Sequence, residues 1–388
     1  MISASTFLDA AGRLHTYLVQ NYWNGQSLAG PDSGIRLNAR FGRFIKSYLP
    51  FVPWADTYSY MQTQGYWIMS NWIIHDLLHY PAASALAMSA TAYVLNTQRR
   101  EGYWDYPNPE WKGRIATVEG CFAAMGLLES YRRTQRTALL EGATRWHRFL
   151  VEEIGFQQTN GLLAINYFSN VQGTMVPNNT TLVLMNMAHL ADAGGDDRYR
   201  STCGPMVAWL NTVQMESGEL PYAVKNTSVP DRPHFLCYQY NAFEFLDLVD
   251  YYQLTGDRAI MPVLERLAGY LATGFTAAGT ARYDCMHNQP EIVYYTVALA
   301  RALSQATLMG IGDFRALTEQ AYQWVLSMQR TDGGFKFFSR RNYGMLQDRR
   351  SYPRNLAMML YHLLTEARAQ QIGTEATISP EPARATVL

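Results

Sequence analysis

Six residues in two neighbouring loops have side chains suited to proton transfer beside a carboxylate. They are Asn178, Asn179, Arg232, His234, Tyr238 and Tyr240. Removing a proton from the carbon next to a carboxylate is difficult unless amide or guanidinium donors neutralise that carboxylate. A tyrosine or histidine must then accept the proton. The same residues also allow a structural interpretation, in which the asparagines cap a helix and the tyrosines and histidine are buried and hydrogen-bonded.

A third segment, SRRNYGMLQDRRSYPRN, concentrates positive charge near the C-terminus. Its arginines are Arg340, Arg341, Arg349, Arg350 and Arg354. Guanidinium groups bind carboxylates and phosphates through two parallel hydrogen bonds. The segment therefore indicates an anionic substrate, such as an acidic saccharide, a sugar nucleotide or a diphosphate. A solvated surface partly paired with Asp348 is the alternative interpretation.

These segments belong to a repeat that predicts the fold. Five units each contain an amphipathic helix, a glycine turn, a short aromatic or β-branched stretch, a polar loop and a second helix. The turn glycines are Gly102, Gly161, Gly218, Gly279 and Gly333, at separations of 54 to 61 residues, and the segment around Gly34 is a looser sixth copy. The second helix of each unit is apolar on most sides, which is typical of a buried helix, whereas the first has a charged face. We therefore predict an all-α (α/α)6 toroid, with an inner ring of helices inside an outer ring.

Composition excludes several classes of protein. The 388 residues carry 32 Lys and Arg against 32 Asp and Glu, whereas nucleic-acid and membrane-surface binders usually have a basic excess. No segment has the pattern of a signal peptide or a membrane-spanning helix. Four scattered cysteines without a C-x-x-C motif fit a reducing compartment. We expect a cytoplasmic protein without a nucleic-acid partner or transmembrane segment, with one toroid domain over residues 1–372 and a flexible tail over 373–388.

The repeat resembles that of a known superfamily. The phrases LNTQRREGYWDYP, LNTVQMESGELPY and VLSMQRTDGGFKF are similar to the Q-x-x-x-G-aromatic repeats of α/α-toroid proteins. That superfamily includes alginate- and chondroitin-type polysaccharide lyases, uronate C5-epimerases and α/α-barrel glycosidases. The repeat is also similar to that of squalene cyclases and prenyltransferase β-subunits. The resemblance spans nearly the whole chain and implies the toroid fold.

The two loops with proton-transfer residues resemble the catalytic layout of the alginate and chondroitin lyases. In those enzymes one loop supplies Asn for the substrate carboxylate, and the next supplies Arg or His followed by a catalytic Tyr. The resemblance implies a carboxylate-binding pair, a tyrosine that is both base and acid, and a second base. Asn178 or Asn179, together with Arg232, would bind the carboxylate. Tyr238 or Tyr240 would be both base and acid, and His234 would be the second base. The sequence departs from the alginate-lyase pattern at Thr180, where a His usually follows the Asn.

The loops that precede the apolar helices converge at one end of a toroid, and here they are rich in Tyr, Trp, Asn, His and Arg. Aromatic faces stack on sugar C–H groups, while amides and guanidinium groups bind hydroxyls. Aromatic residues that simply fill the core are the alternative. The predicted substrate-binding residues are Trp54, Asp56, Tyr66, Trp67, Trp104, Tyr106, Arg114, Glu119, Asp284, His287, Arg341, Tyr343 and Arg350.

Two alternative chemistries use other residues. A type II terpene cyclase protonates an alkene with an aspartic acid, a role open to Asp284 backed by His287, although the D-x-D-D pattern is missing. A zinc site of the prenyltransferase kind would draw on His234, Cys237, Asp284, Cys285 and His287. These residues lack the D-x-C spacing of that family, and a buried cysteine more often acts as a small hydrophobic residue. We therefore predict no metal and no cofactor, with zinc at this set as the open alternative.

Glycoside hydrolysis and non-catalytic carbohydrate binding also stay open. Hydrolysis needs two carboxyl groups about 5–10 Å apart. The candidate pairs combine Asp105 or Glu119 with Asp284 or Glu291. Glu119 has two structural explanations, as a partner of Arg114 or as an acid at the start of its own helix. Our leading hypothesis is an enzyme acting on an acidic, uronate-containing saccharide by C5-proton abstraction, as a lyase or an epimerase, in polysaccharide or glycoconjugate metabolism.

Overall fold

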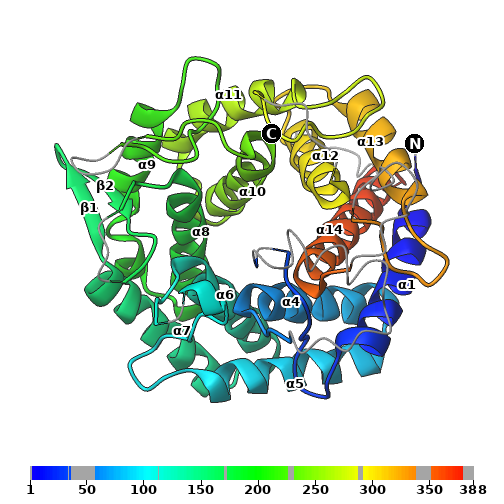
Figure 1. Cartoon of the computed structure of the whole chain (residues 1–388), viewed down its shortest axis with the longest axis horizontal. Coiled ribbons are helices and arrows are strands. Elements are labelled where there is room, and N and C mark those ends of the chain that lie inside the picture. Colours follow the sequence, from blue (N-terminus) through cyan, green and yellow to red (C-terminus); the bar gives the residue numbers. More distant parts are fainter. Residues whose placement is uncertain are drawn as a thin grey trace, which may run out of the picture.

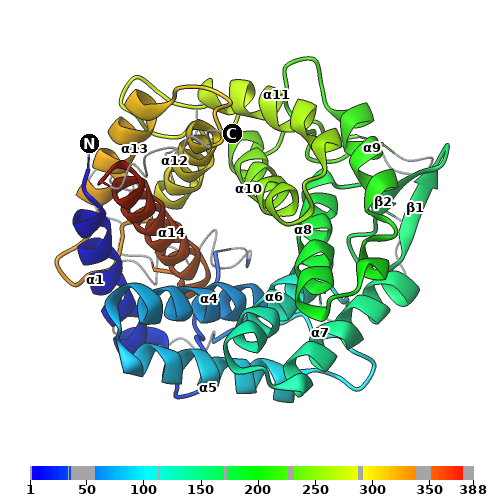
Figure 2. The ribbon, with the colours of Figure 1, turned by 180° about the vertical axis from the view of Figure 1, so that it is seen from behind.

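The computed structural model of the chain describes residues 2–33, 35, 57–111, 113–169, 173–225, 231–286, 292–337 and 351–378. These residues form twelve α-helices and one two-stranded sheet. The helices make a closed ring with an inner and an outer layer (Figure 1), and the same arrangement is seen from behind (Figure 2). The predicted all-α (α/α)6 toroid is therefore confirmed.

The inner layer contains the apolar helices. They are α4 (Met61–Leu78), α6 (Thr117–Thr134), α8 (Pro177–Gly194), α10 (Cys237–Thr255), α12 (Val293–Leu308) and α14 (Pro353–Ile378). Each helix packs on the next, and α14 packs on α4, so that the inner ring closes. Neighbouring helices cover most sides of these helices, which explains their largely apolar sequences. In α12, for example, the first eight residues are all buried.

The outer layer contains the amphipathic helices. They are α1 (Ala4–Tyr22), α5 (Pro81–Thr97), α7 (Thr137–Phe149), α9 (Cys203–Val213), α11 (Met261–Ala272) and α13 (Arg315–Ser327). In α7, Leu139, Ala143 and Trp146 are buried at the spacing of one helical face. A hairpin of β1 (Phe156–Thr159) and β2 (Leu162–Ile165) lies at the outer edge of the ring (Figure 1).

The Q-x-x-x-G repeat forms a hydrogen-bonded joint between neighbouring outer helices. Gln98 Nε2 donates to the carbonyl oxygens of Gly102 at 2.9 Å and of Gly142 in α7 at 2.8 Å. Arg145 of α7 donates back to Gln98 Oε1 at 2.6 Å. The same joint recurs at two further places, with the residue sets Gln214, Gly218, Val263 and Arg266, and Gln329, Gly333, Ala10 and Arg13. The last set joins α13 to α1 and so closes the outer ring.

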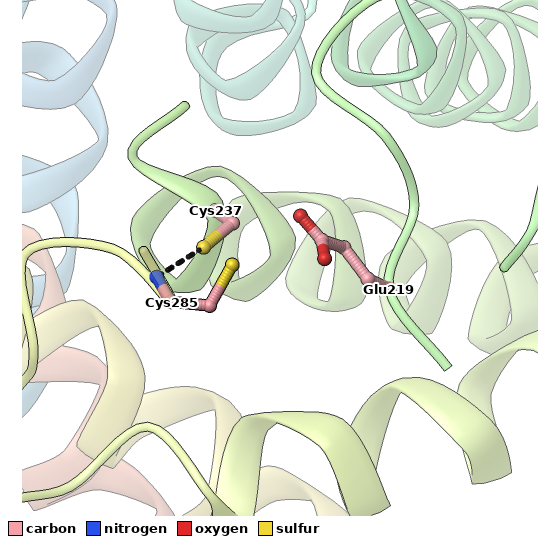
Figure 3. A group of neighbouring side chains, drawn as sticks. All are labelled: Glu219, Cys237 and Cys285. Carbon is pink, nitrogen blue, oxygen red and sulfur yellow. Dashed lines mark hydrogen bonds between the residues drawn. The ribbon is translucent and has the colours of Figure 1, made fainter. Parts of the chain in front are cut away.

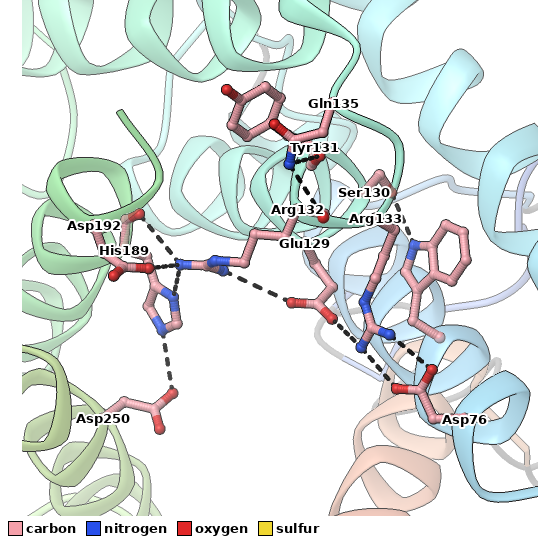
Figure 4. Close-up of polar contacts among 11 residues, drawn as sticks. Asp76, Glu129, Ser130, Tyr131, Arg132, Arg133, Gln135, His189, Asp192 and Asp250 are labelled. Atoms are coloured by element: carbon pink, nitrogen blue, oxygen red, sulfur yellow. Dashed lines mark hydrogen bonds and ion pairs between the residues drawn. The ribbon is translucent and has the colours of Figure 1, made fainter. Parts of the chain in front are cut away.

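Ion pairs connect the inner helices near their C-terminal ends (Figure 4). Arg133 of α6 donates to both carboxylate oxygens of Asp76 in α4, each at 2.7 Å. Arg132 of α6 donates to Asp192 in α8 at 3.0 Å. These side chains are partly exposed, so each pair contributes only about 0.2–1 kcal/mol to stability. Their main effect is to hold the inner helices at a fixed spacing.

The C-terminal helix α14 continues to Ile378, past the predicted end of the domain at residue 372. The rest of the predicted tail lies outside the described residues. None of the helices in the described part of the chain combines the length and the hydropathy needed to cross a membrane.

The joint that closes the outer ring leads to a stability prediction. Gly333 has a φ of +90°, and a methyl group there would lie 2.4 Å from the carbonyl oxygen of Arg13. We expect Gly333→Ala to lower the free energy of unfolding by about 2–4 kcal/mol, because left-handed backbone strain adds to a steric clash. Gly25→Ala is the matched control, since Gly25 has a φ of +100° and a methyl group there would meet no non-neighbouring described atom within 4 Å.

Gly25→Ala should cost only the backbone strain, about 1–2 kcal/mol. Urea unfolding followed by circular dichroism measures both variants. Equal losses of stability in the two variants would contradict the proposed close contact between α1 and the last turn.

Candidate active site

One cavity of about 660 Å³ lies among the loops that lead into the inner helices and the first turns of those helices. Twelve of the described residues that line it are aromatic: Tyr66, Phe122, Tyr167, Tyr222, Phe235, Tyr240, Phe243, Tyr283, Tyr294, Tyr295, Phe337 and Tyr352. Five more carry amides: Gln62, Asn178, Asn179, Gln239 and Asn355. The described lining residues also include one carboxyl group, that of Asp247, and one guanidinium group, that of Arg354. The wall therefore combines stacking surfaces with groups that bind hydroxyls and carboxylates.

Helix α10 lines the cavity with one of its faces. Tyr240, Phe243 and Asp247 follow one another at intervals of three and four residues and so share that face. Along the helix axis, Tyr240 and Asp247 are separated by about 10 Å. Asp247 also lines a second cavity of about 140 Å³, which shares Tyr66 and Phe122 with the first. The Asp247 carboxyl group therefore lies where the two cavities meet.

Burial changes the acidity of both polar groups on this face. It raises the pKa of Asp247 well above the usual range, although the Thr181 hydroxyl donates to this carboxylate at 3.1 Å and partly opposes the rise. Burial also raises the pKa of Tyr240 well above its ordinary value, and the neighbouring Tyr222 and Tyr167 add to that rise. The environment therefore favours the protonated carboxyl group and the protonated phenol.

Arg354 supplies the positive charge on this wall. Its Nε and Nη2 lie 2.8 and 3.0 Å from the carboxylate oxygens of Asp32, which is 1% exposed. The guanidinium carbon is 4.5 Å from the centroid of the Tyr60 ring. One hydrogen bond, one ion-pair contact and the Tyr60 ring together fix the plane of the guanidinium group. Arg354 is the member of the predicted arginine cluster that lies within the described residues.

Two amides on the wall each have one buried atom that lacks a hydrogen-bond partner among the described residues. Asn179 Nδ2 and Gln239 Oε1 form no hydrogen bond among the described residues, although Gln239 Nε2 donates to the Tyr294 hydroxyl at 3.4 Å. Buried polar atoms without partners are rare in native structures and cost about 1–3 kcal/mol each. Their position on a cavity wall indicates that a polar ligand or water completes these hydrogen bonds.

The predicted proton-transfer residues are only partly brought together. Asn178, Asn179 and Tyr240 line the cavity. Tyr238 lies on a different face of α10. Its ring stacks on that of Tyr270, with the two ring centroids 5.0 Å apart. The structure thus separates the two tyrosines that the sequence left as alternatives.

Arg232 and His234 are not among the described residues that line the cavity. The guanidinium carbon of Arg232 is 3.9 Å from the centroid of the Phe235 ring, which does line it. His234 Nδ1 lies 3.0 Å from Glu219 Oε2 and 3.4 Å from Cys285 Sγ. His234 therefore belongs to a separate cluster of polar side chains.

Two of the predicted substrate-binding tryptophans are core residues. Trp67 is 0% exposed and stacks on His15, with the ring centroids 4.8 Å apart. Trp104 is 1% exposed, and its indole N–H donates to the carbonyl oxygen of Val94 at 2.8 Å. Core packing accounts for the burial of both residues. Tyr66, by contrast, lines both cavities.

Three further predicted residues make contacts away from the described cavity wall. Tyr106 packs on Tyr60, with the ring centroids 5.9 Å apart, and Arg114 lies 4.9 Å from the ring centroid of Trp111. The Asp284 carboxylate accepts a hydrogen bond from the backbone N–H of Met286 at 2.9 Å. The remaining predicted residues lie outside the described residues: Trp54, Asp56, His287, Arg341, Tyr343 and Arg350.

Glu119 caps a neighbouring helix. Its carboxylate accepts hydrogen bonds from the backbone N–H groups of Met61, at 2.5 Å, and Gln62, at 3.4 Å, at the start of α4. The roles predicted for Glu119 from the sequence were different: substrate binding, an ion pair with Arg114, or an acidic residue in the first turn of its own helix. Burial raises the pKa of Glu119 to about 7, and the positive charge of Arg354 opposes part of that rise.

Asp247 is not among the site residues predicted from the sequence. The sequence feature that could have indicated Asp247 is its position as an acidic residue within FEFLDLVDYY, an apolar segment of an inner helix. Glu219, which contacts His234, also lacked a signal, because its partners are distant in sequence.

The comparisons with known proteins agree with this architecture. No protein-family model and no curated protein sequence matches the chain. The cellobiose 2-epimerase from Bacillus thermoamylovorans B4167 is similar, with a TM-score of 0.72, 13% identity, and coverage of 93% of this chain and 99% of the epimerase. A polysaccharide lyase has a TM-score of 0.65 and 10% identity, covering 95% of this chain and 98% of the lyase.

A type II terpene cyclase from Scytonema, in complex with its product merosterolic acid A, has a TM-score of 0.58 and 14% identity. That match covers 94% of this chain and 98% of the cyclase. The structural neighbours are thus α/α-toroid enzymes, as the repeat resemblance implied. At these sequence identities the likeness shows the shared fold alone.

The environment of Glu119 predicts a pH dependence of stability. Its pKa is about 7 in the folded protein, against a usual value of 4.5. The folded state therefore holds this proton more tightly, and the resulting stabilisation is present below about pH 4.5 and is lost as the pH rises through about 7. The free energy of unfolding should fall by about 3 kcal/mol over that range through this group.

Glu119→Gln should remove this part of the pH dependence, because the amide oxygen still accepts the two N–H bonds but cannot ionise. Urea unfolding at several pH values between about 4 and about 8 measures it. Glu101→Gln, at an exposed position, is the control and should follow the original protein. A Glu119→Gln profile parallel to that of the original protein would contradict the assignment.

Proposed function

We propose that this chain is an enzyme that acts on an acidic saccharide in the 660 Å³ cavity. The combination of aromatic rings, amides and a guanidinium group on one wall carries this proposal. Rings stack on sugar C–H faces, and amides bind hydroxyls as donors and acceptors. Arg354 favours a substrate that carries a carboxylate. A cellobiose epimerase and a polysaccharide lyase share the fold, which supports a saccharide substrate.

The proposed reaction begins with loss of the C5 proton of a uronate. Arg354, with Asn178 or Asn179, binds the carboxylate and stabilises the negative charge that develops on it. In a lyase, the electron pair of the C5–H bond forms a C4–C5 double bond, the C4–O bond breaks, and the leaving oxygen takes up a proton. In an epimerase, a proton returns to C5 from the opposite face.

Asp247 and Tyr240 are our candidates for the base and the acid. Burial raises the pKa of Asp247, and a carboxylate with a raised pKa is a stronger base than an ordinary one. Tyr240 suits the donor role better than the base role, because burial stabilises its protonated form. Their separation of about 10 Å along α10 leaves room for a sugar ring between the two side chains.

A type II terpene cyclase is the second candidate, and one observation favours it. Asp247 is a carboxyl group with a raised pKa beside an aromatic cage, which is the arrangement needed to protonate an alkene. Asp284, which the sequence suggested for this role, is not among the described lining residues. Asn179 Nδ2 and Gln239 Oε1 favour a saccharide, because a hydrocarbon would leave these buried atoms without a hydrogen-bond partner among the described residues.

Tyr240→Phe tests the acid. Removing one hydroxyl should lower kcat by about 10²–10⁴-fold with the fold intact, because the leaving oxygen loses its proton donor. Tyr238→Phe is the matched variant, since Tyr238 lies on the same helix but stacks on Tyr270. It should keep the original activity.

The substrates for this measurement are uronate-containing polysaccharides, a neutral glucan and a polyprenyl diphosphate. The ultraviolet absorbance of an unsaturated uronyl product reports lysis, and uptake of solvent deuterium at C5 reports epimerisation. Full activity of Tyr240→Phe would remove Tyr240 from the mechanism. Turnover of the polyprenyl substrate alone would favour the terpene cyclase.

Asp247→Asn tests the base. The amide has nearly the same shape but cannot take up a proton, so kcat should fall by about 10²–10⁴-fold. In the original enzyme the rate should fall on the acid side, at a higher pH than for an ordinary aspartate, because burial raises the pKa of Asp247. Asp250→Asn, at a half-exposed position on the same helix, is the control for helix stability. An unchanged rate in Asp247→Asn would exclude this role.

A further inference from the structure

A second group of reactive side chains lies apart from the cavity wall, where three segments of the chain meet (Figure 3). Glu219, Cys237 and Cys285 each offer one possible ligand atom, and these atoms all lie within 4.8 Å of one another. His234 adds a fourth, because its Nδ1 is 3.0 Å from Glu219 Oε2 and 3.4 Å from Cys285 Sγ. Glu219, Cys237 and Cys285 therefore surround a common point, and His234 borders it on the side of Glu219 and Cys285.

The spacing of these atoms is close to that of a tetrahedral zinc site. Zinc binds sulfur at about 2.3 Å and nitrogen or oxygen at about 2.0–2.2 Å, which places neighbouring ligand atoms about 3.3–3.8 Å apart. Two thiolates, an imidazole and a carboxylate are all established zinc ligands, and thiolates select zinc over harder ions such as magnesium. Glu219, Cys237 and Cys285 already lie within 4.8 Å of one another, and His234 would turn toward Cys237 Sγ to complete the set.

Two backbone features favour a metal at this point. The N–H of Cys285 donates to Cys237 Sγ at 3.1 Å, and such a hydrogen bond stabilises a metal-bound thiolate. Leu236, between His234 and Cys237, has a φ of +47°, a left-handed conformation that is costly for a residue other than glycine. Leu236 directly precedes Cys237 at the start of α10, so this strained turn sets where the Cys237 side chain enters the cluster.

We propose that Glu219, His234, Cys237 and Cys285 bind one Zn²⁺ ion. With four protein ligands the site is closed, which is typical of a structural rather than a catalytic zinc. This set differs from the zinc alternative considered from the sequence, because Glu219 replaces Asp284, and His287 lies outside the described residues.

The ion would fix three parts of the cavity wall. Tyr222, Phe235 and Tyr283 line the cavity, and each lies within three residues of a proposed ligand in the sequence. None of the four ligands is itself a described lining residue. The zinc proposal therefore does not depend on the proposed reaction, and its test does not require a substrate.

Metal analysis of the whole chain tests the site. Protein purified from zinc-supplemented medium should contain about one zinc per chain. After removal of zinc by a chelator, added Co²⁺ should give the d–d absorption of a tetrahedral ion and a thiolate charge-transfer band. Cys285→Ser should lose most of the zinc and weaken that band while keeping the circular dichroism spectrum, because Cys285 is exposed.

Cys203→Ala is the matched control, since Cys203 is buried in α9 and belongs to no such cluster among the described residues. It should bind metal as the original protein does. Original protein that binds neither zinc nor cobalt would overturn the proposal, and so would Cys285→Ser with undiminished zinc. If thiol titration shows that Cys237 and Cys285 form a disulfide and no metal binds, the cluster is a redox pair and the proposal is wrong.

Discussion

Closure of the ring is the constraint on which the cavity depends. The loops that lead into the inner helices lie far apart in sequence, and only a closed ring brings them to one end. The ring closes where α1 packs on α14. It also closes in the outer layer, where Arg13 of α1 donates a hydrogen bond to Gln329, which follows α13. The contact is specific because Gln329 uses its amide N–H twice, toward Ala10 and toward Gly333. A change there would alter the cavity without touching any residue of its wall.

The fold was predictable because the repeat is a local signal. Gly102, Gly218 and Gly333 follow their glutamines by four residues, and all three have positive φ values in the structure. That spacing reflects a turn whose hydrogen bonds involve the nearby chain and the next helix. The alternation of apolar and amphipathic helices is equally local, since it records how many sides of each helix are covered.

The cavity wall was less predictable, because residue type alone does not determine the direction of a side chain. Tyr238 and Tyr240 are two residues apart, and only their positions around α10 separate a packed ring from a lining ring. Trp67 resembles a sugar-stacking residue in sequence but fills the core. Glu119 acts across a helix boundary, and Glu219 meets partners from two other segments. Contacts of this kind arise only in the folded chain.

The proposed reaction makes two opposite demands on Asp247. Binding of an anionic sugar near this side chain is easiest when its carboxyl group is neutral, because an ionised group would repel the substrate carboxylate. Proton abstraction requires the ionised form. Asp32 offsets part of the positive charge of Arg354, so Arg354 alone does not cancel the repulsion between an ionised Asp247 and the substrate carboxylate. Burial raises the pKa of Asp247 well above its ordinary value, which favours the neutral carboxyl group as the anionic substrate enters and makes the carboxylate a stronger base once it has ionised.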